Sequence, residues 1–157
     1  MKRILLIIAL FLPLYTFGGN RIVVSKRLLQ LYVVNEKGDT LFNRPIACGT
    51  NYGNKTCVGD HKTPEGTFRI TKMYDATSWK HDFKDGKGMR KEAYGPLFFR
   101  LNVPGFNDIG IHGTIFPESI GTRSSEGCVR MRNDDIKKLY PYCYIGMPVI
   151  IEPDETE

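Results

Sequence analysis

The sequence predicts a mainly β domain of antiparallel strands with one or two short helices, and three observations favour this class. Short runs rich in β-branched and apolar residues recur from residue 21 onward. The segment 35–39, Asn-Glu-Lys-Gly-Asp, separates two of these runs and is typical of a hairpin turn. Only the stretch around residues 133–140 has the spacing of an amphipathic helix.

The expected strands follow one another with tight connections. They are residues 21–25, 28–34, 41–42, 45–48, 67–72, 97–101, 109–111 and 148–151. Residues 63–66, Thr-Pro-Glu-Gly, form a turn before the fifth run, because proline fixes φ and glycine adds freedom two residues later. Residues 102–108 read as the turn before the strand that ends near His112.

The helix has recognisable start and stop signals. Asn133 is placed to cap it, and Asp134 and Asp135 suit the positive N-terminal end. Apolar side chains recur on one face before Pro141 ends the helix. We expect this face to pack on the sheet.

The N-terminus has the pattern of an export signal. Lys2 and Arg3 precede an apolar run at residues 4–12, which is short for a membrane span. We interpret residues 1–19 as a secretory signal peptide, which predicts a protein exported to the periplasm or cell envelope. An uncleaved anchor is the alternative, because no clear Ala-x-Ala site follows the apolar run.

Residues 20–152 are expected to form one domain, and residues 153–157 a flexible acidic tail. Loss of residues 1–19 removes Lys2 and Arg3 and lowers the formal charge from +5 to +3. A mildly basic surface tolerates an acidic polymer, although an ordinary solvated surface explains it equally well. No basic run is interleaved with aromatics, so nucleic acid is not an expected partner.

Cys128 and His112 are the candidate nucleophile and base. A free thiol has a pKa of about 8.5, and a neighbouring imidazole can take its proton. Backbone N–H groups of Gly127 and Cys128 are candidates for an oxyanion hole. A backbone carbonyl is one candidate to orient the second nitrogen of His112. The alternative interpretation is that the cysteine is a small buried apolar residue.

Two motifs change the balance between these interpretations. Ile-His-Gly-Thr at 111–114 and Ser-Glu-Gly-Cys-Val-Arg-Met at 125–131 resemble the signature of the L,D-transpeptidase catalytic domain, or YkuD domain. Thr-Pro-Glu-Gly-Thr-Phe at 63–68 and Tyr-Gly-Pro-Leu-Phe at 94–98 resemble further segments of that family. The resemblance covers nearly all of residues 21–152 and implies an antiparallel β-sandwich of this type.

The resemblance implies an exported peptidoglycan L,D-transpeptidase. Cys128 would form a thioester with a tetrapeptide stem, and an acceptor amine would then take the acyl group. It implies no metal and no cofactor, with peptidoglycan stem peptides as partners of a monomer. A carboxypeptidase or a hydrolase of wall-linked protein on the same fold is the alternative, followed by a non-catalytic wall-binding module.

Other residues of the signature are candidates for substrate binding. Arg130 can bind a carboxylate bidentately, or it can serve as an ion pair or backbone tether. Ser125 and Thr114 can hydrogen-bond the site or satisfy turns, and Gly113 borders the site through its backbone. Glu126 departs from the pattern, since many members have histidine there, which puts in doubt any role taken over for that position.

Four cysteines in an exported protein raise the question of disulfides. Cys48 and Cys57 flank a polar, turn-rich stretch, and either a bridge between them or two free thiols is open. Catalysis requires a reduced Cys128, which leaves Cys143 buried and unpaired. No zinc-ligand spacing is present.

Residues 75–93 interrupt the rhythm of strands with a long polar excursion. Trp79 and Phe83 either contact substrate from a lid or wall of the groove, or anchor a solvated loop. His81 receives no catalytic role, because nothing in the sequence ties it to the cysteine. His61 is interpreted as a turn residue at the surface, with an approach to substrate as the alternative.

Overall fold

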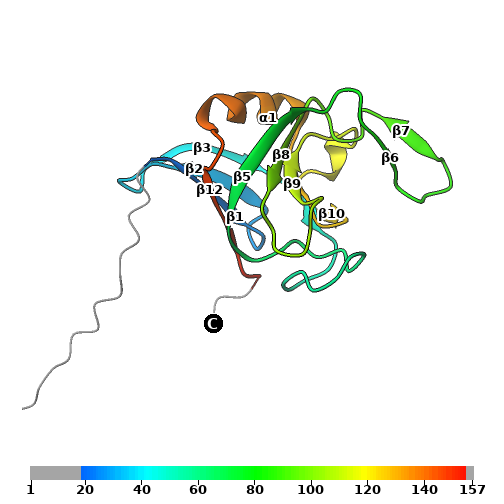
Figure 1. Ribbon diagram of the computed structural model, residues 1–157, viewed down its shortest axis with the longest axis horizontal. Helices are drawn as coiled ribbons and strands as arrows, with labels where there is room; N and C mark the ends of the chain where they lie inside the picture. The colour runs from blue at the N-terminus through cyan, green and yellow to red at the C-terminus, as the bar shows by residue number, and fades with distance from the viewer. Residues whose placement is uncertain (1–18, 155–157) are drawn as a thin grey trace, which may run out of the picture.

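A computed structural model describes residues 19–154, and it confirms the mainly β class (Figure 1). An eight-stranded sheet has the order β11-β9-β8-β5-β12-β1-β2-β3, and two-stranded pairs β10-β4 and β6-β7 lie beside it. The strands are β1 (Arg21–Ser25), β2 (Gln30–Val34), β3 (Thr40–Pro45), β4 (Cys48–Gly49), β5 (Gly66–Asp75), β6 (Lys80–Asp82), β7 (Met89–Lys91), β8 (Leu97–Leu101), β9 (Gly110–His112), β10 (Arg123–Ser125), β11 (Val129–Arg130) and β12 (Pro148–Glu152). The helices are α1 (Asn133–Leu139) and the 3₁₀ turns η1 (Pro117–Ser119) and η2 (Tyr140–Tyr142).

The long strand β5 joins the two halves of the sheet. Its first residues pair with β12, and the residues from Ile70 to Asp75 pair with β8. The register shifts between Ile70 and Lys72, and a bulge of this kind bends a strand. The sheet therefore curls into a sandwich-like core (Figure 1).

Three strand pairs are parallel, which corrects the expectation of a purely antiparallel arrangement. They are β1 with β12, β4 with β10, and β9 with β11. A parallel pair needs a long crossover, and the segment 113–128 supplies one between β9 and β11. As a result, the residues that precede β9 and β11 lie at the same end of these two strands.

The helix α1 begins at Asn133 and buries Ile136 and Leu139 against the core. The predicted cap at Asn133 is wrong: Arg132 occupies the cap position, and no side chain caps the helix. Asn133 instead accepts a hydrogen bond from the Thr114 backbone through its side-chain oxygen, at 2.8 Å. The helix start therefore holds the loop after β9.

Asp154 is firmly held, which corrects its assignment to a flexible tail. Its carboxylate accepts hydrogen bonds from Lys26 Nζ at 3.0 Å and from the Gly53 N–H at 2.6 Å, and it also pairs with Arg123. Its side chain is 6% exposed. The expected signal peptide falls almost entirely on residues 1–18, outside the described part of the chain. No helix between residues 19 and 154 is long and apolar enough to cross a bilayer.

Candidate active site

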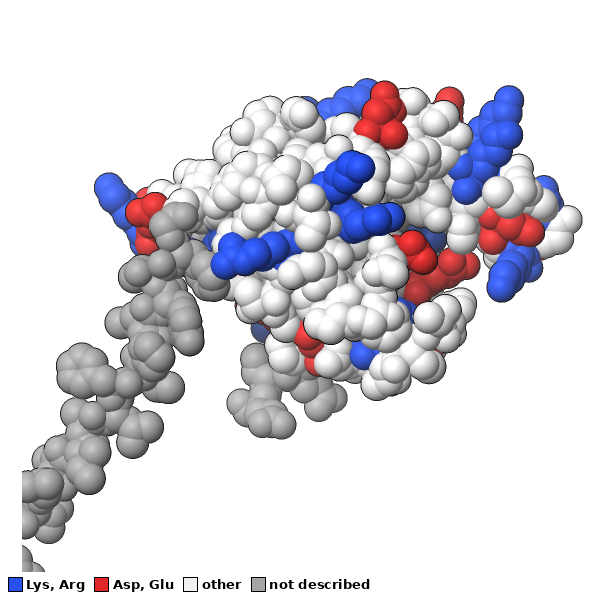
Figure 2. Space-filling model, viewed as in Figure 1, with Lys and Arg blue, Asp and Glu red and all other residues white. Residues whose placement is uncertain are grey.

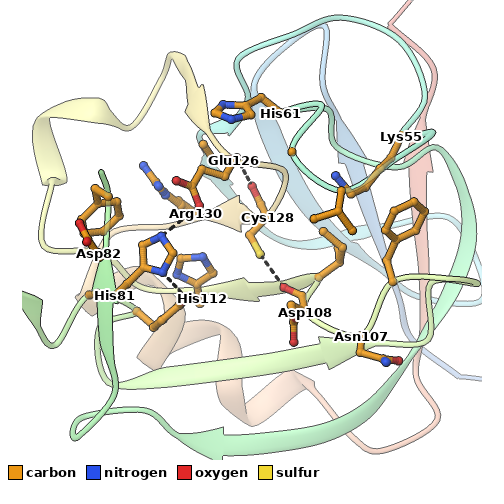
Figure 3. A pocket seen from close by; sticks show the side chains of 18 of the residues that line it. Lys55, His61, His81, Asp82, Asn107, Asp108, His112, Glu126, Cys128 and Arg130 are labelled. Carbon is orange, nitrogen blue, oxygen red and sulfur yellow. Dashed lines mark hydrogen bonds and ion pairs between the residues drawn. The ribbon is translucent and has the colours of Figure 1, made fainter. Parts of the chain in front are cut away.

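Cys128 and His112 line one pocket of about 660 Å³ (Figure 3). Its walls come from the loop after β4, the β6–β7 hairpin, the turn before β9 and the segment from β10 to β11. The lining residues are Lys55, Val58, Gly59, His61, His81, Asp82, Phe83, Lys84, Ala93, Tyr94, Gly105, Phe106, Asn107, Asp108, Ile109, His112, Ser125, Glu126, Cys128 and Arg130.

The parallel pairing of β9 and β11 sets the positions of both residues. Arg130 lies opposite His112 in the register, so Cys128 immediately precedes the paired segment. The Met131 N–H donates to the His112 carbonyl at 2.8 Å and closes the ladder beyond them. Cys128 therefore lies two positions before the residue that pairs with His112, although the two are sixteen positions apart in the sequence.

The buried imidazole of His112 is oriented by the backbone and by two rings. Its Nδ1 lies 2.5 Å from the Gly113 carbonyl oxygen, which can only accept a hydrogen bond, so Nδ1 carries the proton. Phe98 stacks on the ring at 5.5 Å, and Tyr94 meets it edge-on at 5.0 Å. The Nε2 lone pair is therefore available to accept a proton.

His112 is held in its neutral form. Burial lowers its pKa to about 3, the charge of Arg130 acts in the same direction, and the hydrogen bond to Gly113 opposes them. Its unprotonated Nε2 has a lone pair that can accept a proton.

Cys128 is a half-buried thiol whose Sγ donates to the Asp108 carbonyl oxygen at 3.2 Å. Burial is the main cause that raises its pKa to about 11, while the Gly110 N–H and the charge of Arg130 lower it. The resting pair is thus a neutral thiol and a neutral imidazole. Proton transfer to His112 has to accompany nucleophilic attack.

The segment before Cys128 forms a tight turn around Ser125. The Ser125 hydroxyl donates to the Cys128 carbonyl at 2.6 Å and accepts from the Gly127 N–H at 3.1 Å. Gly127 has φ of 139°, and a Cβ there would lie 2.9 Å from the Lys62 carbonyl oxygen. Ser125 therefore satisfies the turn, which is one of its two predicted roles.

The same bonds bear on the expected oxyanion hole. The Gly127 N–H is already engaged with Ser125, so it is not a free donor. Among residues 19–154, none accepts from the Cys128 N–H. Of the two predicted oxyanion-hole donors, the Cys128 N–H is thus the one without an acceptor among the described residues.

Gly113 and Thr114 serve the loop rather than the pocket wall. The Thr114 hydroxyl accepts from the Phe116 N–H at 3.0 Å, and neither residue lines the pocket. A Cβ on Gly113 would lie 2.3 Å from the side-chain oxygen of Asn133. Both residues pack closely on the start of α1, and their predicted substrate contacts stay predictions.

Arg130 is 7% exposed, yet it lines the pocket. Its Nη1 donates to the Ser124 carbonyl at 3.2 Å, and its guanidinium carbon lies 5.7 Å from the centre of the Phe83 ring. Burial lowers its pKa, and no carboxylate of the described residues pairs with it. The backbone tether is thus present, while the contribution of Arg130 to carboxylate binding stays a prediction.

Three contacts at the pocket were not predicted from the sequence. His81 lies 3.0 Å from Glu126, Lys55 pairs with Asp60 at 2.7 Å, and the Asp108 backbone meets the cysteine. Asp108 acts through its carbonyl, which any residue type provides. The His81–Glu126 contact joins residues 45 positions apart and the Lys55–Asp60 ion pair lies within a loop, so no spacing rule indicates them.

The excursion at residues 75–93 forms the β6–β7 hairpin, which protrudes from the body of the fold (Figure 1). Trp79 packs against Tyr74 and Phe98 at 5.1 and 5.3 Å between ring centres, so it anchors the hairpin. Phe83 and His81 line the pocket, so the hairpin acts as its wall. His61 also lines the pocket while remaining exposed.

All four cysteines are free thiols. Cys48 and Cys57 are therefore two free thiols in this structure and not a disulfide bridge. Cys143 is partly buried, and its thiol donates to the Leu139 carbonyl at 3.5 Å. Between residues 19 and 154, no cluster of three or more His, Cys, Asp or Glu side chains is arranged to hold a metal ion.

Comparisons with known proteins agree with this geometry. The model of the L,D-transpeptidase catalytic domain, YkuD, matches residues 19–151. Bacillus subtilis YqjB, whose name assigns it provisionally to the L,D-transpeptidases, is 29% identical over 151 residues, which cover 90% of this chain and 80% of YqjB.

Solved structures give the same result for the fold. Bdellovibrio bacteriovorus Bd1075 is 29% identical with a TM-score of 0.62, covering 90% of this chain and 50% of that one. The catalytic domain of the Enterococcus faecium L,D-transpeptidase is 17% identical with a TM-score of 0.62, covering 86% and 98%. The present chain thus spans about half the length of Bd1075.

Proposed function

Because the chain belongs to the L,D-transpeptidase catalytic domain family, we propose that it is an exported peptidoglycan L,D-transpeptidase in which Cys128 is the nucleophile and His112 the base. The observation that carries the proposal is the pairing of β9 with β11. In this register Cys128 directly precedes β11, two residues before the position that pairs with His112, and its thiol lines the same pocket as an imidazole with a free Nε2.

In the first half-reaction, the Cys128 sulfur attacks the amide carbonyl before the terminal D-Ala of a tetrapeptide stem. His112 Nε2 takes the thiol proton as the bond forms. The Cys128 N–H stabilises the oxyanion. His112 then returns the proton to the departing D-Ala nitrogen, which leaves a thioester on Cys128.

In the second half-reaction, the side-chain amine of another stem attacks the thioester carbon. His112 takes one proton from the attacking nitrogen and gives it to the Cys128 sulfur as the thioester breaks. The product is a cross-link between the third residues of two stems. Water in place of the amine gives a trimmed stem, which is carboxypeptidase activity.

We also propose export to the cell envelope on the evidence of residues 1–19, and a monomer that requires no cofactor. Product analysis tests the choice between transfer and hydrolysis. The reduced protein, incubated with tetrapeptide muropeptides, is expected to give cross-linked dimers and free D-Ala. Trimmed stems without dimers would assign hydrolysis instead, and intact muropeptides would contradict both activities.

A further inference from the structure

The carboxylate of Glu126 faces the pocket beside the catalytic cysteine. Its side chain is 44% exposed, and one oxygen lies 3.0 Å from Nε2 of His81 on β6. The other nitrogen of His81 lies 3.1 Å from the Tyr94 hydroxyl. One imidazole therefore joins the β6–β7 excursion to the segment before Cys128, 45 residues later in the sequence, and Figure 3 shows His81 beside Glu126.

The chemistry of these groups gives the hydrogen-bond chain a direction. A carboxylate only accepts, so His81 Nε2 carries a proton and donates to Glu126, and in the neutral ring Nδ1 accepts from the Tyr94 hydroxyl. Burial raises the pKa of Tyr94 to about 12, which keeps its hydroxyl protonated as the donor. Glu126 thus ends the chain as an oriented acceptor, and its second oxygen has no partner among residues 19–154.

Charged groups lie on both sides of Cys128. Figure 3 shows Asp82, Glu126 and Arg130 on one side of the sulfur, with Lys55 and Asp108 on the other. Lys55 is paired with Asp60 at 2.7 Å. Figure 2 shows acidic side chains in the hollow between the body of the protein and the β6–β7 hairpin.

Arg130 lies on the same side as Glu126 and offsets part of its charge. Its side chain, however, is almost fully buried and is held by the Ser124 carbonyl. The more exposed carboxylate therefore meets an incoming ligand first. This side of the pocket suits a cationic group.

We propose that Glu126, oriented by His81, binds the ammonium group of the acceptor stem next to the thioester on Cys128. The inference rests on the proposed function and names the acceptor subsite. An alkyl amine has a pKa near 10.4 and arrives protonated, so a carboxylate attracts it through a charge-assisted hydrogen bond. The ammonium then loses one proton to water before it attacks.

The test separates binding of the acceptor from formation of the thioester. Glu126→Gln in the full chain keeps the size of the side chain and removes its charge. Glu118→Gln is the matched control, because Glu118 is exposed and does not line the pocket. The probe is a tripeptide stem with a free side-chain amine, compared with the same stem acetylated on that amine.

In the Cys128→Ala background, Glu126→Gln should raise the Kd of the free-amine stem about tenfold, equivalent to about 1.4 kcal/mol. It should leave the Kd of the acetylated stem unchanged, and Glu118→Gln should change neither. With Cys128 present, Glu126→Gln should keep the rate of thioester formation within about twofold and shift products from dimers to trimmed stems. His81→Gln should raise the KM for the acceptor without slowing thioester formation.

An unchanged Kd for the free-amine stem overturns the proposal. A parallel loss of thioester formation also overturns it, since that outcome assigns Glu126 a structural role. If the protein with Cys128 forms no thioester at all, the proposed function fails. The binding comparison in the Cys128→Ala background still decides the role of Glu126.

Discussion

At the residue scale, the site depends on a histidine whose two nitrogens have different surroundings. The Gly113 carbonyl takes the Nδ1 proton, and the pocket receives Nε2. Because the imidazole is buried, its charged form is disfavoured and its pKa falls to about 3. The sequence located His112 and Cys128, but their protonation states depend on burial, which no local pattern gives.

This lowered pKa predicts a pH-dependent stability. The unfolded chain binds a proton at His112 below about pH 6.5, while the folded chain binds it only near pH 3. The free energy of unfolding should therefore fall as pH decreases from 6.5 towards 4, by up to about 1.4 kcal/mol per pH unit from this group. Urea denaturation across this range measures the slope.

His112→Gln should flatten that slope, whereas His61→Gln, at an exposed position, should leave it in place. The comparison uses slopes, so an overall loss of stability in the His112 variant does not affect it. Equal slopes in all three proteins would show that His112 is not buried in its neutral form.

At the element scale, the start of α1 holds the loop that directly follows His112. Asn133 accepts from the Thr114 N–H, and Gly113 packs directly against the asparagine oxygen. The helix itself followed from its apolar spacing. The role of Asn133 was mistaken for a cap, because a cap and a tertiary acceptor use the same side-chain oxygen. Likewise, the parallel pairing of β9 with β11 depends on a crossover whose path short-range patterns do not define.

We predict that Asn133→Ala lowers the free energy of unfolding by about 1–3 kcal/mol, because it leaves a part-buried Thr114 N–H without its acceptor. It should also slow thioester formation. Asn133 holds the Thr114 N–H, and the adjoining Gly113 carbonyl orients His112. Thermal denaturation and single-turnover kinetics measure the two effects. Asp134→Ala, at the exposed neighbouring position, should change stability by only about 0.5 kcal/mol. Equal effects of the two substitutions would contradict the assigned role of Asn133.

At the scale of the whole molecule, Lys26, just after β1, pairs with Asp154 at the end of the described chain. Lys26 is buried, and its ammonium pairs with Glu65 at 2.5 Å and Asp154 at 3.0 Å. Burial lowers the pKa of Lys26, and its hydrogen bond with Glu65 opposes this effect. Asp154 was predicted to be flexible because an acidic terminus usually is. Partners in three distant segments override that local expectation.

The fold class and most strands were predictable, because periodicity and motif order carry them. The sequence also predicts Cys128 and His112 as nucleophile and base, and these roles stay predictions. The side-chain contacts in the pocket wall were harder to predict. His81 and Glu126 are 45 residues apart and meet only after the β6–β7 hairpin has folded beside the cysteine loop. Gly127 has the positive φ that its place in the turn requires, and its N–H donates to Ser125, so its oxyanion role stays a prediction.

The central claim is that Cys128 becomes acylated with His112 as its base. Intact-mass analysis of the reduced, folded protein after exposure to a carbapenem tests it most directly. The account predicts one adduct, located on the peptide that contains Cys128, absent in Cys128→Ala and formed at least about a hundredfold more slowly in His112→Gln. No adduct, or an adduct that persists in Cys128→Ala, would contradict the account.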